Sequence, residues 1–416
     1  MDKNNGAIYD ARKLGKPKMI ILGVQHMFAM FGATILVPIL TGLDISTTLL
    51  MAGLGTLLFH CITKFKVPAF LGSSFAFLGG YAAIKAFSPN DPNSMLPYAC
   101  LGVACAGLIY FILAAVIKAV GIEKVMRFFP PVVTGPIIIA IGLGLAPSAV
   151  SNCTTNWFLA VVALAVIVVF NIWGKGMAKI IPIILGLLIS YGTGLVLYFI
   201  SQANPDLIQN VPWLFSGGAD ANGVYQPIFD FTSLNTICDN ISKGHIFGSE
   251  GLIGIPIHWD KTVFGGIDYS NGALIASSII AIVPIAFATM MEHIGDMSAI
   301  SATVGENFIE DPGLHRTLIG DGLATSLSAL VGGPANTTYG ENTGVLELSK
   351  VHDPKVIRIA ALYAVILSFI PKMAEVIGSM PSAIIGGVSF MLYGMISAIG
   401  VRNVVENHVD FTKSRN

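Results

Sequence analysis

Long apolar segments recur along the whole chain and constrain its fold more than any other feature. A helix needs about 20 mostly apolar residues to cross the hydrocarbon core of a bilayer. Twelve segments of about this kind lie near 18–41, 45–63, 67–88, 96–118, 126–149, 156–174, 178–201, 273–300, 314–333, 334–349, 354–378 and 381–401. Hydrophobic residues make up 54% of the 416 residues and charged residues 11%, which excludes a soluble domain and a disordered chain. The sequence predicts an all-α polytopic membrane protein.

Lysine and arginine gather in alternate connections between these segments. They precede the first segment and follow the second, fourth, sixth, eighth, tenth and twelfth, whereas Lys85, Lys243, Lys261 and Lys372 fall on the other side. Because cytoplasmic loops are enriched in basic residues, both termini are predicted to be cytoplasmic. The polar, basic start contains no short apolar run before a cleavage site, so we expect no removable signal peptide.

Charge and cysteine content exclude several classes of function. A net charge of −1 gives no electrostatic basis for binding nucleic acid. The five cysteines lack the spacing of metal ligands, and their odd number does not predict a disulfide framework. No nucleophile or phosphate-binding motif indicates an enzyme, so we expect neither catalysis nor a cofactor.

The segment Val331–Gly344 contrasts with its apolar surroundings because it contains Pro334, four glycines, several small polar residues and Glu341. Irregular backbone at membrane depth is tolerated only where protein buries it or a wet cavity adjoins it, so we expect a substrate site here. Two interpretations of Glu341 are open. Thr338-x-x-Glu341 matches a capping box, in which the glutamate only closes a helix start. Alternatively, a helix start aims free N–H groups at a cavity, and Glu341 is its reactive group.

Two further acidic residues lie late in the eighth segment. A carboxylate at membrane depth costs about 2.5–3.5 kcal/mol, so Glu292 is expected to face protein or water and to have a function. Asp296 is four residues further, on the same helical face. Like charges at this spacing repel, which implies that one is protonated or that a donor or cation lies between them. In the alternative interpretation the helix ends here and Asp296 lies in cytoplasmic water.

A weak internal repeat links these segments to the first part of the chain. Gln25-His26 is echoed by Glu292-His293, and Gly72–Phe75 is echoed by Asn336–Tyr339. The copies are seven segments apart, and an odd number inverts the second copy across the membrane. Paired, broken segments in corresponding positions are a sequence pointer to the binding site of a transporter. Phe75, Phe77 and Tyr339 either stack on a planar ligand or are packing residues, and His26 either serves the site or is a satisfied core histidine.

At these motifs the sequence resembles the nucleobase–ascorbate transporters, also called nucleobase–cation symporters, and among them the bacterial uracil permeases. The resemblance covers essentially the whole chain. It rests on Gln25–Gly32, Pro68–Phe77, Glu292–Gly295, Asp311–Arg316, Asn336–Asn342 and Glu341–Lys350.

The resemblance implies a 14-span fold of two inverted seven-span repeats, with about twelve spans present here and short β-strands in the broken spans 3 and 10. The core domain would comprise 1–120 and 273–378, spans 1–4 and 8–11. The gate domain would comprise 121–201 and 379–416, spans 5–7 and 12, and 202–272 would be an outer insertion. Spans 13 and 14 would lie beyond Asn416, so the gate domain is expected to be incomplete. A non-transporting truncated copy is the alternative.

The function implied by the resemblance is import of uracil by proton symport across a bacterial inner membrane, with xanthine or another purine as the alternative substrate. By motif position the substrate-binding residues would be Glu292, Glu341, Phe75, Tyr339, Gly340 and Ser74, with Tyr393 approaching from the gate. Glu292 and Glu341 would also couple protons, with His26 and Asp296 in support; relatives often carry histidine at the position of Asp296. The implied partners are a nucleobase, the lipid bilayer and a second copy in a homodimer.

Overall fold

The computed structural model describes residues 7–121, 124, 131–243, 247–248, 251–406 and 408–409, and among these not the side chains of Pro131, Thr134, Glu341 and Glu406. The chain divides into two compact units. Unit 1 comprises 1–130 and 253–371, and unit 2 comprises 131–252 and 372–416. The segment 202–272, treated as one insertion in the sequence, is therefore shared between the units. The assignment of core and gate domains stays a prediction.

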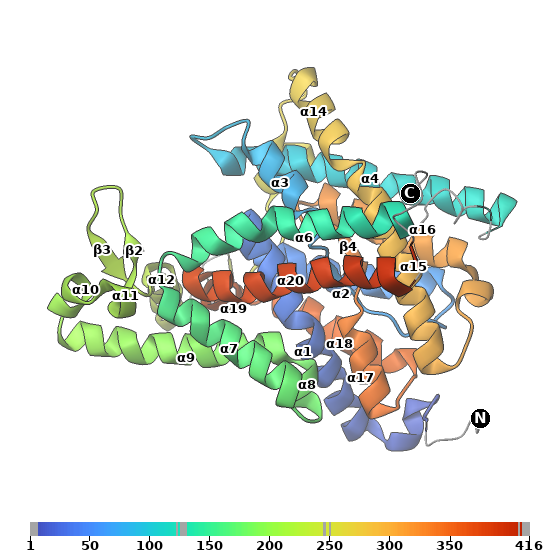
Figure 1. Cartoon of the computed structure of the whole chain (residues 1–416), viewed down its shortest axis with the longest axis horizontal. Coiled ribbons are helices and arrows are strands. Elements are labelled where there is room, and N and C mark those ends of the chain that lie inside the picture. The colour runs from blue at the N-terminus through green and yellow to red at the C-terminus, as the bar shows by residue number, and fades with distance from the viewer. Residues whose placement is uncertain are drawn as a thin grey trace. The chain divides into compact units, whose positions relative to one another are not determined.

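Unit 1 is built from both halves of the chain, and its elements are labelled in Figure 1. They are η1 (Ala11–Leu14), α1 (Lys16–Thr41), α2 (Ile45–Ile62), β1 (Leu71–Ser73), α3 (Leu78–Lys85), η2 (Pro92–Met95), α4 (Leu96–Val120), η3 (Trp259–Lys261), α13 (Val263–Gly266), α14 (Gly272–Ile282), α15 (Ile285–Val304), η4 (Ile309–Gly313), α16 (Leu314–Leu330), β4 (Asn336–Thr338), α17 (Glu341–Ser349) and α18 (Pro354–Ser368).

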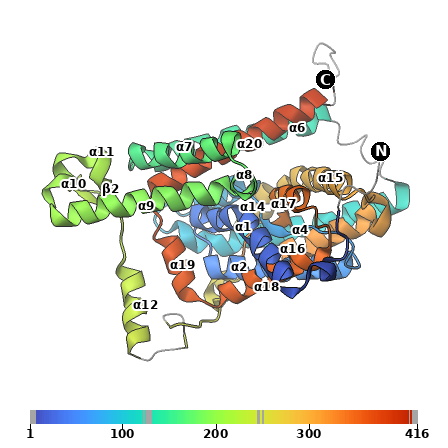
Figure 2. The same ribbon diagram turned by 90° about the horizontal axis from the view of Figure 1, so that it is seen from below.

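Unit 2 contains long and short helices and a two-stranded antiparallel sheet. Its elements are α6 (Pro131–Cys153), α7 (Trp157–Trp173), α8 (Met177–Ile180), α9 (Pro182–Ala203), α10 (Asp206–Asn210), α11 (Pro212–Phe215), β2 (Ser216–Ala219), β3 (Tyr225–Pro227), α12 (Thr232–Ser242), α19 (Pro371–Gly378) and α20 (Ser382–Glu406). In Figure 1 the β2–β3 hairpin projects away from α10 and α11, and Figure 2 shows these two short helices at one end of α9.

Seven helices within the described ranges are long and apolar enough to cross a membrane, or eight if α18 and α19, bent by 87°, count as one span. The predicted class, a mostly helical polytopic membrane protein, is confirmed. The number of twelve spans and the inverted repeat stay predictions, because the broken segments contain strands and short helices that a criterion of length does not count.

Polar caps in the sequence set several helix ends. Asp44 accepts the Thr47 N–H at 2.7 Å at the start of α2, and Asp353 accepts the Lys355 N–H at 2.9 Å at the start of α18. Gly42 follows α1 with φ of 86°, a left-handed conformation that favours glycine, and its N–H bonds to Pro38 O. These caps satisfy backbone groups that a helix end leaves unpaired.

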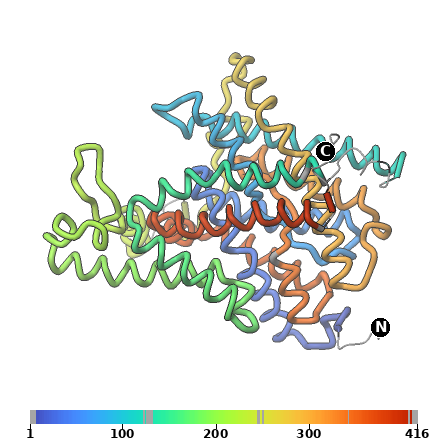
Figure 3. The backbone as a smooth tube through the Cα atoms, viewed as in Figure 1, coloured from blue at the N-terminus to red at the C-terminus, as the bar shows by residue number. Residues whose placement is uncertain are grey.

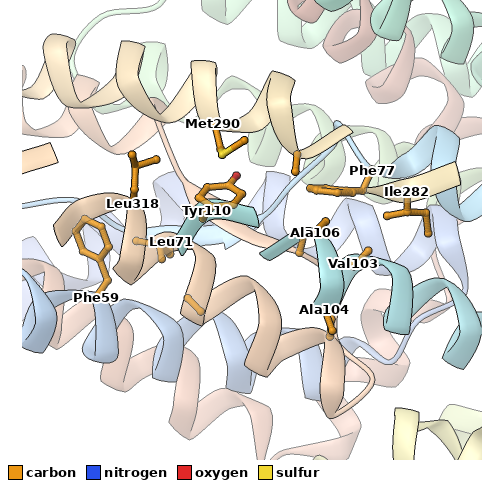
Figure 4. Close-up of a cluster of buried hydrophobic side chains, with 14 of the residues drawn as sticks. Phe59, Leu71, Phe77, Val103, Ala104, Ala106, Tyr110, Ile282, Met290 and Leu318 are labelled. Carbon is orange, nitrogen blue, oxygen red and sulfur yellow. The ribbon is translucent and has the colours of Figure 1, made fainter. Parts of the chain in front are cut away.

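Close helix packing holds unit 1 together around a buried apolar cluster. Phe59 of α2, Leu71 of β1, Tyr110 of α4, Met290 of α15 and Leu318 of α16 meet there (Figure 4). α4 and α16 cross closely, since a Cβ at Gly322 would lie 2.6 Å from Gly107 O. In Figure 3 the dark blue tube of α1 lies beside the orange tube of α18, and the two helices are in contact. Segments from the first and second parts of the chain therefore pack together in unit 1.

A two-stranded antiparallel sheet lies within unit 1, and it positions the broken third and tenth segments. Leu71, Gly72 and Ser73 pair with Thr338, Thr337 and Asn336. The Tyr339 N–H donates to Phe70 O and the Ser74 N–H to Ala335 O, each at 2.9 Å. β1 leads into α3 and β4 into α17, so each broken segment is a short strand followed by a short helix.

Candidate functional site

The junction between β4 and α17 is where the sequence predicts the substrate site. α17 begins at Glu341, and its N-cap is Gly340, which has no side chain to cap the helix. Thr338 lies in β4, where its hydroxyl donates to Asp296 Oδ2 at 2.9 Å. The capping-box interpretation is therefore wrong, because this threonine bonds to a carboxylate and not to the helix start. The side chain of Glu341 lies outside the described part of the chain.

Asp296 and Glu292 lie one turn apart on α15, which continues to Val304. The interpretation in which the helix ends at Asp296 is therefore wrong. Glu292 is exposed and Asp296 is half-buried. Asp296 also lies against the β4–α17 junction, since its Oδ1 is 3.5 Å from the place of a Cβ on exposed Gly340. The structure thus brings Asp296, Gly340 and the start of α17 together, with Glu292 on the adjoining turn.

A buried acid–histidine pair adjoins this group. His293 Nδ1 lies 3.4 Å from Asp321 Oδ2 on α16, and both side chains are fully buried. The same His293 nitrogen is 3.3 Å from the Thr338 hydroxyl. Asp296, Thr338, His293 and Asp321 therefore form a continuous polar path from the half-buried carboxylate into the interior. Asp321 was not among the residues predicted for the site, although an acidic residue between two glycines within an apolar segment is a signal for it.

His26 is fully buried on α1 and contacts the residue that follows Glu341. The Asn342 Nδ2 lies 3.3 Å from His26 Nδ1 and donates to His26 O at 3.1 Å. His26 therefore lies beside the start of α17, as expected. Its partner there is Asn342, which was not predicted as a site residue.

The side chain of Tyr339 fixes β1 to α1. Its hydroxyl donates to Ser73 O at 2.7 Å and lies 3.4 Å from the Thr34 hydroxyl. Its ring fills the space beside Gly72, where a Cβ would lie 2.6 Å from two ring carbons. Phe77 is fully buried in the apolar cluster of Figure 4. These contacts favour packing roles for both rings and leave half-buried Phe75 as the aromatic candidate for stacking.

Two further predicted residues are placed as follows. Ser74 is buried beside Phe75, and its backbone continues the strand ladder. Tyr393 lies in unit 2, on α20, where it is 3% exposed and where its carbonyl would be 2.5 Å from a Cβ on Gly142. Tyr393 therefore belongs to a different unit from the other predicted site residues, and its approach to them stays a prediction.

An arm of residues 8–14 closes the far end of α17. Ile8 bridges to Val351 and the Tyr9 hydroxyl donates to Val304 O at 2.7 Å. The Ala11 N–H donates to Asp353 Oδ2 at 2.8 Å. His352 lies against Tyr9, with ring centroids 5.4 Å apart, and burial lowers the pKa of its imidazole. The arm therefore ties the start of the chain to the α17–α18 connection.

Within the described residues no group of three or more histidine, cysteine, aspartate or glutamate side chains is arranged to hold a metal ion. The groups available at the site are carboxylates, backbone N–H groups, an aromatic ring and the buried pair of His293 and Asp321. Such a set suits hydrogen bonding to a polar planar molecule and the holding of protons.

Solved structures show the class of protein to which this fold belongs. The chain resembles the transmembrane domain of BicA, a cyanobacterium bicarbonate transporter, with a TM-score of 0.58 and 13% identity over 96% of this chain and 98% of that one. It resembles SLC26A9 with a TM-score of 0.52 and 10% identity over 98% of this chain and 61% of that one. The chain therefore has the fold of a membrane transporter.

Sequence comparison identifies the family. A family model described as "Permease family" matches residues 17–416, and the chain belongs to this family. It is 38% identical over 408 residues to the uracil permease of Bacillus caldolyticus, which covers 95% of this chain and 82% of that protein. It is 34% identical over 415 residues to the putative pyrimidine permease RutG of Escherichia coli, covering 99% and 83%.

Proposed function

We propose that this chain imports uracil, or a closely related nucleobase, together with protons across a bacterial cytoplasmic membrane, with both of its termini on the cytoplasmic side. The observation that carries the proposal is the hydrogen bond from Thr338 to Asp296, which places this carboxylate beside the β4–α17 junction, one turn from exposed Glu292. The substrate class is supported by the relatives named uracil permease.

The uracil ring edge alternates N–H donors with carbonyl acceptors, so a matching site needs acceptors and donors at fixed spacing. Carboxylates of Glu292 and Glu341 would accept the ring N–H groups through charge-assisted hydrogen bonds. The backbone N–H groups near Gly340 and Phe75 would donate to the ring carbonyls, and the Phe75 ring would cover one face. The aromatic and carboxylate groups thereby select a neutral planar ligand over a free anion.

Proton coupling would follow from the spacing of the carboxylates. Glu292 and Asp296 repel each other when both are charged, so a proton on one of them is favoured. The neutral acid can donate to a uracil carbonyl, which makes substrate binding favour the proton-loaded state. The path through Thr338 and His293 to Asp321 would give that proton further places to reside, with His26 supporting the start of α17.

Alternating access of a core against a gate domain would carry the proton and the neutral substrate inward together. One net charge then moves per cycle. At about 100 mV this supplies ~2.3 kcal/mol, enough for roughly forty-fold accumulation by the rule of tenfold per 1.4 kcal/mol.

Uptake into proteoliposomes tests the proposal. With an inward proton gradient and a negative interior, we expect saturable uptake of radiolabelled uracil that a protonophore abolishes. Uptake that neither requires nor dissipates the gradient would contradict the coupling. In the same assay, stronger competition by unlabelled xanthine than by uracil would make the substrate a purine, and sulfate should not compete. Binding without uptake would indicate a non-transporting copy.

Glu341→Gln tests the assigned carboxylate. Removing the charged acceptor should weaken uracil binding about a hundredfold, the cost of a charged hydrogen bond. Glu347→Gln is the matched control, because Glu347 is an exposed residue of the same helix. Equal affinity of Glu341→Gln and the unsubstituted chain would refute the role of Glu341.

A further inference from the structure

Two buried threonines each accept the backbone N–H of the first residue of a site strand. On α2, Thr56 Oγ1 accepts the Leu71 N–H at 2.9 Å and lies 3.2 Å from Leu71 O. On α16, Thr325 Oγ1 accepts the Asn336 N–H at 3.2 Å and donates to Asn336 O at 2.8 Å. Thr56 therefore accepts the N–H of the residue that begins β1, and Thr325 serves both the N–H and the carbonyl of the residue that begins β4. The other strand does not reach these groups.

These contacts follow the symmetry of the strand pair itself. Gly72 and Thr337 pair at its centre, and the ladder ends in two equivalent bonds of 2.9 Å, Tyr339 to Phe70 and Ser74 to Ala335. A half-turn about the central pair exchanges Leu71 with Asn336, the two residues held by the threonines. The bond from the strand N–H to a threonine hydroxyl is thus made twice by separate parts of the chain.

An ordinary structural explanation covers only part of this arrangement. A threonine within a helix commonly bonds to the carbonyl four residues earlier, as the Thr56 hydroxyl does with Ala52 O at 2.7 Å. That bond would be complete without any strand. The additional bonds to Leu71 and Asn336 join helix to strand, and both threonine side chains are fully buried, so water does not compete for them.

We propose that Thr56 and Thr325 are a matched pair of positioning residues, which fix the height of β1 against α2 and of β4 against α16. This inference rests on the proposed function, because it takes the strand–helix junctions as the binding surface. Phe75 and Gly340 each lie four residues beyond the held residue. Slippage of one strand would therefore move its junction out of hydrogen-bonding distance of a ligand that the other junction still holds.

The test compares Thr56→Val and Thr325→Val, which keep the shape of the side chain, with Thr56→Ser and Thr325→Ser, which keep the hydroxyl. Thr63→Val is the matched control, because that buried hydroxyl bonds only to carbonyls of its own helix, Phe59 O and His60 O. Affinity for uracil is measured on the purified full chain. Hydrogen exchange by mass spectrometry is followed over residues 67–77 and 332–340.

Each valine variant should bind uracil about tenfold more weakly, the effect of leaving buried backbone groups unpaired. Each should also speed exchange in its own strand, whereas the serine variants and Thr63→Val stay close to the unsubstituted chain. Valine variants that bind normally would overturn the proposal. So would serine variants that lose as much affinity as valine, since shape and not the hydroxyl would then matter.

The exchange measurement separates this inference from the proposed function. If the unsubstituted chain binds no uracil, the proposed substrate is wrong, and unchanged exchange over both strands in the valine variants would independently overturn the positioning role. Thr56→Cys or Thr325→Cys replaces any valine variant that does not fold, because the thiol keeps a weak donor. The held strand of the cysteine variant should then exchange faster than that of the serine variant. Equal exchange in the cysteine and serine variants would count against the positioning role.

Discussion

β1 and β4 pair with each other in unit 1, and a threonine of a neighbouring helix accepts the N–H of the first residue of each strand. Their surroundings differ in charge. β1 is bordered by neutral groups, Tyr339, Thr34 and the carbonyl of Ala33 among them. β4 is bordered by Asp296, His293 and, through this histidine, Asp321. The backbone frame is thus repeated, whereas the acidic chemistry is confined to the second half.

The difference can be followed position by position. In the predicted repeat, Glu292-His293 corresponds to Gln25-His26, so an acid in one half would stand where an amide stands in the other. Asp321 lies four residues before Thr325, and Ala52 lies four residues before Thr56. With this arrangement, backbone groups beside β1 could bond to one side of a polar ring, and carboxylates beside β4 could bond to the other side. Doubling the acids would have placed too many like charges in one poorly solvated site.

The strongest way to break this comparison is to remove the buried carboxyl group of the second half. Asp321→Ala removes the carboxyl group beside His293 and should destabilise the chain by about 3 kcal/mol, the cost of breaking a buried pair. Thermal unfolding in detergent measures this loss. Ser326→Ala on the same helix removes only a neutral bond to Ala104 O and should cost about 1 kcal/mol. Equal losses of stability in the two variants would mean that Asp321 contributes no more than a neutral hydrogen-bonding group.

Next in size is the loss of the exposed acid, Glu292→Gln. It should weaken uracil binding by about a hundredfold and flatten the dependence of binding on pH, with little change in stability because the side chain is exposed. Isothermal titration at several pH values provides the measurement. Glu306→Gln, an exposed glutamate beyond the end of α15, should bind like the unsubstituted chain. An unchanged affinity in Glu292→Gln would remove the acidic half from the binding site.

A smaller effect is expected from crowding the neutral half. Gly72→Ala places a Cβ 2.6 Å from the Tyr339 ring and should destabilise the chain by about 1–3 kcal/mol. Tyr339→Leu in the same chain makes room and should recover part of this loss. Gly79→Ala is the control, since a Cβ there meets nothing within 4 Å. If Gly72→Ala and Gly79→Ala melt alike, the ring does not fix β1.

The smallest effect concerns the arm of residues 8–14, which contacts the connection between α17 and α18. Burial lowers the pKa of His352, so its neutral form is favoured in the folded chain, while Glu306 acts in the opposite direction. Protection of residues 8–14 from proteolysis should therefore be complete above the ordinary histidine pKa of about 6.5 and decline as the pH falls below it. His352→Gln should remove this dependence. A decline that persists in His352→Gln would assign it to another group.

Much of the class and frame could be predicted from the sequence because it depends on local properties. Apolar length predicted membrane helices, and the breaks around Gly72 and Pro334 predicted the two irregular segments. The spacing of Glu292 and Asp296 predicted a shared helix face, which α15 has. Each of these rests on residues near one another in the chain.

What the sequence did not predict depends on partners from distant elements. The spacing of Thr338 and Glu341 resembles a helix cap, but Thr338 lies in β4, and Asp296, which accepts its hydroxyl proton, comes within reach only in the folded chain. Asp321 and Asn342 are recognised as site residues only through their contacts with His293 and His26, which lie on other helices. No local pattern distinguishes Thr56 from a threonine bonded only within its own helix.

The pairing of β1 with β4 also sets the order in which the chain can be completed. Ser73 and Tyr339, which bond across this pair, are 266 residues apart. At about 5–20 residues per second, synthesis takes roughly 15–50 s to supply the second strand after the first. Until then the ladder groups of β1 have no partner strand, in a membrane environment where unpaired backbone is costly. The first half therefore has to be sheltered by other protein or by water, and the site appears only late in biogenesis.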